Sequence, residues 1–227
     1  KFIIKNISLL LKKLKKLKIK NEIILINDGS IDNTYLKIKK IKKKSIKVIN
    51  LKKNCGKSFA VRLGISKARS NYVILIDCDL PYFEKFNFLI KKLISGYDFV
   101  TIDRRHKKSS IKNKSFSVYQ FSRLLIGNLI GRAINISLNL NKKKIDTQAG
   151  LKGFKNSNKL KKMKFVSKKF FLDVELMFYF IKNNMSFFFI PVKYNIKNES
   201  SIKFFSLNSF KIMYELIKVI RSLRRQI

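Results

Sequence analysis

Short apolar runs alternate with amphipathic segments through the first half of the chain, and this alternation is what most constrains the fold. The apolar runs lie at 22–26, 45–51, 72–76 and 99–102, each followed by polar or turn-forming residues. The segments 3–17, 59–68 and 83–94 have the pattern of helices. Strands that alternate with helices at this spacing predict a mostly parallel, Rossmann-like sheet flanked by helices, which is an α/β fold.

The second half of the chain has longer helical segments and fewer strands. We expect a basic loop at 103–115, an apolar helix at 116–140, a polar motif at 146–154, a helix at 170–182, a strand at 187–192 and an amphipathic helix at 204–225. No internal repeat and no linker rich in Pro or Gly interrupts the sequence. We therefore predict one domain over 1–227, in which 204–227 could lie on a membrane surface.

The chain is strongly basic, with 52 Lys and Arg against 13 Asp and Glu and a formal net charge of +39 over 227 residues. Such a charge favours a polyanionic partner: a nucleic acid, an anionic lipid or a phosphorylated substrate. The alternative is codon bias, because Lys, Ile, Asn and Phe are abundant together, as an AT-rich genome would produce. With 46% hydrophobic residues the chain can bury a core, which excludes wholesale disorder.

Neither a disulfide framework nor a transmembrane helix is expected. Cys55 and Cys78 stand beside polar motifs and are predicted to be free thiols, while the lone His106 is predicted to be solvated. No run reaches 18 uninterrupted apolar residues. The sequence starts at Lys1 rather than Met, already within an amphipathic pattern, so we expect a truncated N-terminus.

Asp77-Cys78-Asp79 follows the apolar run 72–76 and carries the clearest chemistry. Two carboxylates at the end of a buried strand repel each other unless something neutralises them. A hard divalent cation with oxygen ligands would do so, and such a cation typically also holds substrate phosphates. The alternative is a solvated pair of Asp residues at the start of a loop, because short D-x-D matches are common by chance.

Two other polar motifs follow apolar runs. INDGSID (26–32) is either an ordinary turn or the source of a carboxylate for a nucleotide base or ribose, and Asp32 or Asn33 could cap the next helix. The loop 54–58, with Gly56 and Lys57, is either a plain turn or an anion site at a helix N-terminus. Because ligands bind beyond the carboxyl ends of strands in such sheets, we expect both motifs and the D-x-D to share one edge.

The order of these motifs is more specific than any one of them. INDGSID (26–32), NCGKSFAVRLGISKA (54–68) and VILIDCDL (73–80) together resemble the family 2 glycosyltransferases, which have the GT-A fold. Downstream, DTQAGLKGF (146–154), FLDVELMFYFIKNN (171–184) and FIPVKY (189–194) look like the branch that makes polyprenyl- or dolichyl-phosphate sugars. The resemblance covers about residues 5 to 205. It implies transfer of a sugar from a UDP- or GDP-sugar to a polyprenyl or dolichyl phosphate, with Mg²⁺ or Mn²⁺ as cofactor.

The resemblance also implies roles for the matching residues. Those implied to bind the nucleotide-sugar are Asp28, Gly29, Ser30, Asp32, Lys57 and Asp77. The implied metal ligands are Asp79 and Asp77. Those implied to serve catalysis are Asp77, Asp79, Arg104, Asp146, Gln148 and Glu175, with Asp173 on the same helix as Glu175. For the two acidic residues of that helix, structural pairing with a Lys or Arg is the alternative.

The implied chemistry agrees with the composition of the site. A divalent ion and Arg or Lys would stabilise the diphosphate leaving group. A lipid phosphate is already an anionic nucleophile, so no strong general base is required, and single displacement would invert the anomeric centre. The segments 116–140 and 204–225 could lie on an anionic membrane surface, or they could simply pack on the sheet. We expect a peripheral protein on the cytoplasmic face of a membrane.

Three alternatives remain. A family 2 transferase acting on a saccharide or cell-surface glycan would need a carboxylate base, which the sequence does not identify. A basic nucleic-acid-binding protein is supported by charge alone, without an RNA-recognition, helix-turn-helix or zinc pattern, so no specific nucleic acid is expected. An inactive scaffold is conceivable because the family's first strand is absent, Asn27 and Pro81 replace the more usual Asp and Gln, and Ile102-Asp103-Arg104 replaces Gly-Ser-Arg.

Overall fold

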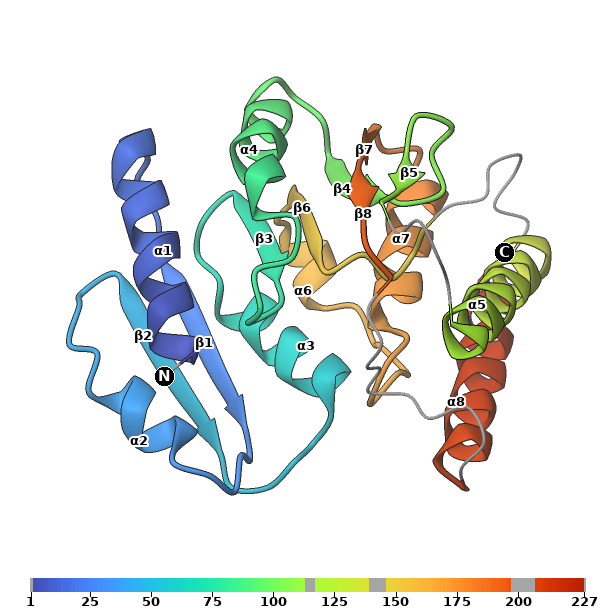
Figure 1. Ribbon diagram of the computed structural model, residues 1–227, viewed down its shortest axis with the longest axis horizontal. Coiled ribbons are helices and arrows are strands. Elements are labelled where there is room, and N and C mark those ends of the chain that lie inside the picture. Colours follow the sequence, from blue (N-terminus) through green and yellow to red (C-terminus); the bar gives the residue numbers. More distant parts are fainter. Residues whose placement is uncertain (1, 113–116, 139–145, 197–206, 227) are drawn as a thin grey trace.

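The computed structural model describes residues 2–112, 117–138, 146–196 and 207–226, and within them the strands form three sheets (Figure 1). β1 (Ile23–Asp28) and β2 (Ile46–Leu51) are a parallel pair. The central sheet has the order β3-β6-β4-β7, with bounds Tyr72–Ile76, Leu151–Lys155, Phe99–Asp103 and Phe187–Pro191. A short parallel pair joins β5 (Ser110–Ile111) to β8 (Lys193–Tyr194).

The α/β prediction is confirmed, and one further strand, β6, lies where only a polar motif at 146–154 was predicted. β4 and β7 are parallel, but β6 lies between β3 and β4 and is antiparallel to both. Its first residue, Leu151, pairs with Ile76 at the end of β3. The polar motif that precedes β6 is therefore brought to the carboxyl end of β3, where the D-x-D begins.

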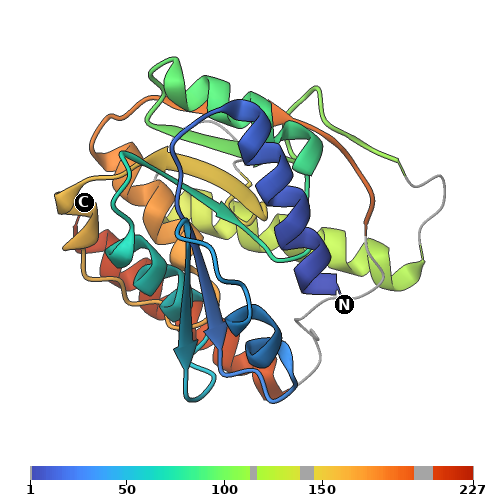
Figure 2. The ribbon, with the colours of Figure 1, turned by 90° about the vertical axis from the view of Figure 1, so that its left-hand side faces the viewer.

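Helices cover both faces of the central sheet (Figures 1 and 2). α1 (Phe2–Leu17) and α4 (Phe86–Ile94, preceded by the 3₁₀ turn η1, Phe83–Lys85) share a core with Val100 and Ile102 of β4. α3 (Lys57–Lys67), α6 (Asn158–Lys161) and α7 (Leu172–Lys182) pack on the other side, with Phe99. Successive residues of a strand face opposite ways, so β4, buried throughout, serves both cores. α2 (Thr34–Lys39) connects β1 to β2.

One glycine sets how closely α4 approaches the sheet. A Cβ on Gly153 of β6 would lie 2.7 Å from Leu93 Cδ1 and 2.8 Å from Leu89 Cδ2, both on α4. The space that a side chain would need is already filled by this fully buried part of the helix. Gly153 therefore allows α4 to pack directly on β6.

Two long helices form a third core at the far end of the molecule from β1 and β2 (Figure 1). α5 (Val118–Ser137) and α8 (Leu207–Arg224) pack together beside α7. α5 begins with a reciprocal capping box between Ser117 and Gln120. The predicted helices at 116–140 and 204–225 are thus observed with shorter bounds, and residues 116, 139–140 and 204–206 lie outside the described ranges. No helix in the described part of the chain combines the length and apolarity needed to cross a membrane.

Candidate functional site

Asp28 joins the first two polar motifs to each other. It ends β1, and its carboxylate accepts hydrogen bonds from the backbone amides of Cys55 (2.7 Å) and Gly56 (2.9 Å). Gly29 follows with a positive φ of 65°, and any Cβ there would overlap the Lys53 backbone. Asp28 therefore holds the 54–56 loop in place, and its implied contact with a nucleotide stays a prediction.

Ser30 and Asp32 also have local partners. The Ser30 hydroxyl donates to Asn27 Oδ1 at 2.6 Å, and Asn27 in turn donates to Asn50 on β2. Asp32, which is fully exposed, accepts from the Thr34 amide at 3.0 Å and so caps α2, whereas Asn33 makes no capping bond. Hydrogen bonds to Thr34 lower the pKa of Asp32. A nucleotide-binding role for either residue stays a prediction.

Lys57 and Asp77 bring the glycine loop and the D-x-D to one point. Lys57 is the first residue of α3, and its Nζ lies 2.7 Å from Asp77 Oδ1, just after β3. Both side chains are partly open to solvent, at 51% and 41% exposed. Burial alone would lower the pKa of Lys57, but the charges of Asp77, Asp173 and Asp79 outweigh it and raise that pKa. Lys57 is therefore a cation held at the centre of an acidic cluster.

The D-x-D loop is fixed on both sides by the backbone. The Asp77 amide donates to the Gly150 carbonyl at 3.1 Å, and Asn6 of α1 donates to the Cys78 carbonyl at 2.7 Å. A Cβ on Gly150 would lie 2.7 Å from Asp77 Oδ2 and from Pro81 Cγ, so a larger residue there would displace the D-x-D loop. Asp79 is exposed, and the free thiols predicted for both cysteines are confirmed.

The two carboxylates of the D-x-D fit a hard divalent cation, but only as part of its ligand set. Among the described residues there is no group of three or more His, Cys, Asp or Glu side chains that could hold a metal ion. Mg²⁺ and similar ions are often held by one or two carboxylates, with water and substrate phosphates completing the shell. Asp79 with Asp77 therefore matches a cation site that a phosphate-bearing ligand completes.

Arg104 and Asp146 form a second ion pair of the candidate site, in which the carboxylate is almost fully buried. Asp146, 2% exposed, accepts from Arg104 Nε at 2.5 Å and from Nη2 at 2.8 Å, and the Arg104 amide adds a third bond. Burial opposes ionisation of Asp146, but the hydrogen bonds and charge of Arg104 outweigh it and lower its pKa. The backbone amide of Gln148 also donates to Asp146, and the Gln148 side chain is exposed.

Three residues that the sequence analysis did not select lie around these groups. Tyr82 and Tyr194 lie within the electrostatic influence of Arg104 and Asp146, and burial raises the pKa of both hydroxyls. Lys152 of β6 is 3% exposed, pairs with Asp173 at 2.8 Å and donates to the Thr147 carbonyl. A buried lysine needs a carboxylate partner, so Lys152 explains the position of Asp173.

Backbone contacts engage two of the groups named from the sequence, Glu175 on α7 and the first turn of α3. Glu175 is 1% exposed, and its carboxylate accepts from the amides of Val166 (2.6 Å) and Ser167 (3.0 Å), so it holds a backbone segment. Burial raises the pKa of Glu175. A catalytic role for Glu175 stays a prediction, but these contacts are structural. The first turn of α3 is also no open anion site, because Ser58 and Phe59 donate to the carbonyls of Lys169 and Lys168.

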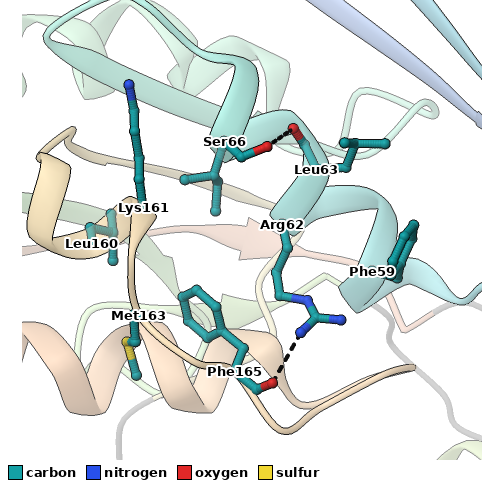
Figure 3. A pocket seen from close by; sticks show the side chains of 9 residues that line it. Phe59, Arg62, Leu63, Ser66, Leu160, Lys161, Met163 and Phe165 are labelled. Carbon is teal, nitrogen blue, oxygen red and sulfur yellow. Dashed lines mark hydrogen bonds between the residues drawn. The ribbon is translucent and has the colours of Figure 1, made fainter.

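A cavity of about 300 Å³ lies between α3 and the segment around Phe165 (Figure 3). Its lining is mostly apolar, and Arg62 spans it to donate to the Phe165 carbonyl at 3.0 Å. None of the predicted site residues lines this cavity. The cavity in Figure 3, between α3 and the segment 160–165, is therefore separate from the charged residues at the strand ends, which form the candidate site.

Comparison with known proteins decides the family. The sequence profile described as "Glycosyl transferase family 2" matches residues 4–161, which include the D-x-D, Lys57, Arg104 and Asp146. The chain belongs to glycosyl transferase family 2.

Two curated relatives show how far this family likeness extends. An uncharacterized glycosyltransferase of Synechocystis sp. is 37% identical over 134 residues, which are 57% of this chain and 40% of that relative. The poly-beta-1,6-N-acetyl-D-glucosamine synthase of Staphylococcus aureus is 42% identical over 76 residues, 30% of this chain and 18% of that enzyme. The chain therefore spans less than half the length of these family 2 relatives.

Solved structures support the same fold. Glucosyl-3-phosphoglycerate synthase of Mycobacterium tuberculosis, in complex with Mn²⁺, UDP and phosphoglyceric acid, has a TM-score of 0.62. The superposition covers 94% of this chain and 72% of that one, at 14% sequence identity. At this identity the likeness establishes the GT-A-like α/β fold alone.

Proposed function

We propose that this family 2 domain transfers a sugar from a UDP- or GDP-sugar to a polyprenyl- or dolichyl-phosphate acceptor. The observation that carries the donor half of this proposal is the 2.7 Å ion pair between Lys57 and Asp77. It joins two motifs that are 20 positions apart in the chain and places a cation beside two carboxylates. A nucleotide diphosphate fits this combination, because a lysine and a carboxylate-bound metal ion would both stabilise its negative charge.

Some of the charged residues would bind the nucleotide-sugar donor, and others would bind the acceptor. Asp79 and Asp77 would hold Mg²⁺ or Mn²⁺, which when bound would stabilise negative charge on the diphosphate leaving group. Lys57 adds a fixed positive charge on the same side. Arg104, oriented by Asp146, has the planar guanidinium that suits a phosphate, and we assign it to the acceptor phosphate.

The lipid nature of the acceptor is supported by two exposed apolar faces. On α5, large apolar side chains at helical spacing form one exposed stripe: Val118, Phe121, Leu125, Leu129 and Ile136. On α8, a second exposed set is Phe210, Met213, Tyr214 and Ile217. Exposed basic residues share the α8 surface, namely Lys211, Lys218, Arg221, Arg224 and Arg225. Apolar and basic side chains together fit the interface of an anionic membrane.

We therefore place the protein peripherally on the cytoplasmic face of a membrane. The two free cysteines agree with a reducing compartment. Its lipid-phosphate acceptor would be anchored in the same membrane and would need no strong general base, because a phosphate oxygen is already anionic. A saccharide acceptor is the second candidate, favoured by the similarity to the Staphylococcus aureus synthase over 76 residues. In that case a carboxylate must act as base.

Calorimetric titration with a panel of UDP- and GDP-sugars tests the donor half. With Mn²⁺ present we expect one nucleotide to bind at least about tenfold more tightly than in EDTA, because the metal bridges the carboxylates and the diphosphate. Binding that is equal with and without the cation would contradict the metal assignment. Transfer to a lipid phosphate and to a soluble saccharide, assayed side by side, separates the two acceptor classes.

Liposome flotation tests the membrane half with a matched pair of substitutions. Leu129→Glu places an acid in the exposed α5 stripe, whereas Leu36→Glu makes the same change on exposed α2. We expect Leu129→Glu to weaken binding to anionic vesicles by about tenfold, since it removes an apolar side chain that the membrane would bury and adds charge repulsion. Leu36→Glu should leave binding within about twofold. Equal losses in both variants would mean that net charge alone drives association.

A further inference from the structure

α8 contains one acidic residue, and that residue points into the protein. Glu215 is half-buried, and its Oε1 accepts three hydrogen bonds: from the Ser167 hydroxyl at 2.8 Å, and from the amides of Lys168 and Lys169 at 2.7 Å each. The rest of the helix's charged side chains are basic. The Glu215 carboxylate, which accepts hydrogen bonds from two consecutive backbone amides, thus forms a specific contact between α8 and the segment 166–169.

A second carboxylate holds the same segment from α7. Glu175 accepts from the amides of Val166 and Ser167, so two carboxylates together bind four consecutive amides. The chain has only 13 acidic residues, and two of them are used on these four positions. Because charge-assisted bonds to backbone amides are among the stronger hydrogen bonds, the two carboxylates restrain the segment from both helices.

The other side of this segment closes the first turn of α3. The carbonyls of Lys169 and Lys168 accept from the amides of Ser58 (3.1 Å) and Phe59 (3.3 Å). The hydroxyls of Ser58 and Ser167 are 2.8 Å apart and fully buried. Gly56 lies so close that a Cβ there would be 2.5 Å from the Lys168 carbonyl oxygen. The residue between these contacts is Lys57, whose side chain pairs with Asp77.

We propose that Glu215 is a positioning residue for the donor site, acting through the segment 166–169 on Lys57. Glu215 fixes the amides of the segment, the carbonyls of the segment fix the first turn of α3, and that turn orients Lys57 toward the D-x-D. The position of the C-terminal helix is thereby transmitted to the donor side of the site. The last link, to nucleotide binding, rests on the function proposed above, whereas the structural links do not.

Hydrogen exchange measured by mass spectrometry on the whole chain tests the structural links. Glu215→Ala should speed exchange about tenfold or more in 166–171 and also in 56–60, while the buried strand 99–103 keeps its wild-type rate. Arg221→Ala, at an exposed position of the same helix, is the control and should change neither segment. Glu215→Gln keeps an acceptor oxygen without the charge, so it should fall between wild type and Glu215→Ala, and it replaces that variant if the alanine protein does not fold.

Each result bears on a different step. Faster exchange in 166–171 with 56–60 unchanged would overturn the relay, and a uniform increase that includes 99–103 would show only a general loss of stability and also overturn it. Titration with UDP and GDP in Mn²⁺ then tests the last link, where we expect about tenfold weaker binding for Glu215→Ala. Equal affinity would overturn the positioning role. If the wild-type chain binds neither nucleotide, the proposed function fails while the exchange result still decides the relay.

Discussion

Asp79→Asn is expected to abolish the cation-dependent part of nucleotide binding and to lower transfer by about 100-fold or more. Asp79 is the exposed carboxylate of the D-x-D, and it is a neighbour of the Lys57–Asp77 pair. An amide keeps the size of the side chain but removes the charge that a hard cation requires. Loss of one preorganised electrostatic contact at a developing charge typically costs roughly 10²- to 10³-fold in rate.

The measurement is the difference in nucleotide affinity with Mn²⁺ and with EDTA, compared between wild type and variant. The matched control is Glu84→Gln, which removes the same unit of charge from an exposed position in the 3₁₀ turn η1. It should retain the wild-type difference. Were Asp79→Asn to retain it as well, the D-x-D would be a solvated acidic pair, and the site would have to bind phosphate through Lys57 and Arg104 alone.

The sequence predicted the elements of the first half well because each strand there is short, apolar and followed by a polar motif. Tyr72–Ile76 matches β3 to the residue, and Asp77 begins the next loop as expected. The strand β6 was missed, because Leu151–Lys155 was assigned to the polar motif 146–154, and its direction could not be predicted either, because so short a segment reads the same in a parallel or an antiparallel ladder. Its neighbours are distant in sequence, so only the assembled sheet determines its direction.

The site was harder to predict than the fold for a physical reason. A motif identifies a residue type at a strand end, but it does not say whether another part of the chain already forms hydrogen bonds with that side chain. Asp28 is such a case, since both its oxygens hold the backbone at 55–56. Glu175 is another, because its amide partners come from a loop without regular structure. Lys152, on a strand that otherwise looks structural, gave no signal that it would pair with Asp173.

Asp146→Asn is expected to destabilise the protein by about 3 kcal/mol at neutral pH. The substitution keeps the shape of the side chain, but it turns one acceptor of the paired guanidinium into an NH₂ donor. One of the two short Arg104 contacts then joins two donors. The guanidinium charge of Arg104 also loses the carboxylate charge that neutralised it at this buried position. Breaking a buried ion pair from one side typically costs roughly 3–5 kcal/mol, and the partial exposure of Arg104 reduces this figure.

The pH dependence of this loss separates the ion pair from simple packing. Folding lowers the pKa of Asp146, so its contribution is fully present above the ordinary carboxyl pKa of about 3.9 and disappears as pH falls toward the lower value of the folded state. Urea unfolding at a series of pH values should therefore show a wild-type advantage over Asp146→Asn that is constant near neutrality and shrinks below about pH 4. Asp98→Asn, at a more exposed pair with Lys155, should cost less at every pH. An advantage that does not change with pH would mean that Asp146 stabilises the fold through shape and neutral hydrogen bonds, and that charge does not fix Arg104 for the phosphate contact proposed above.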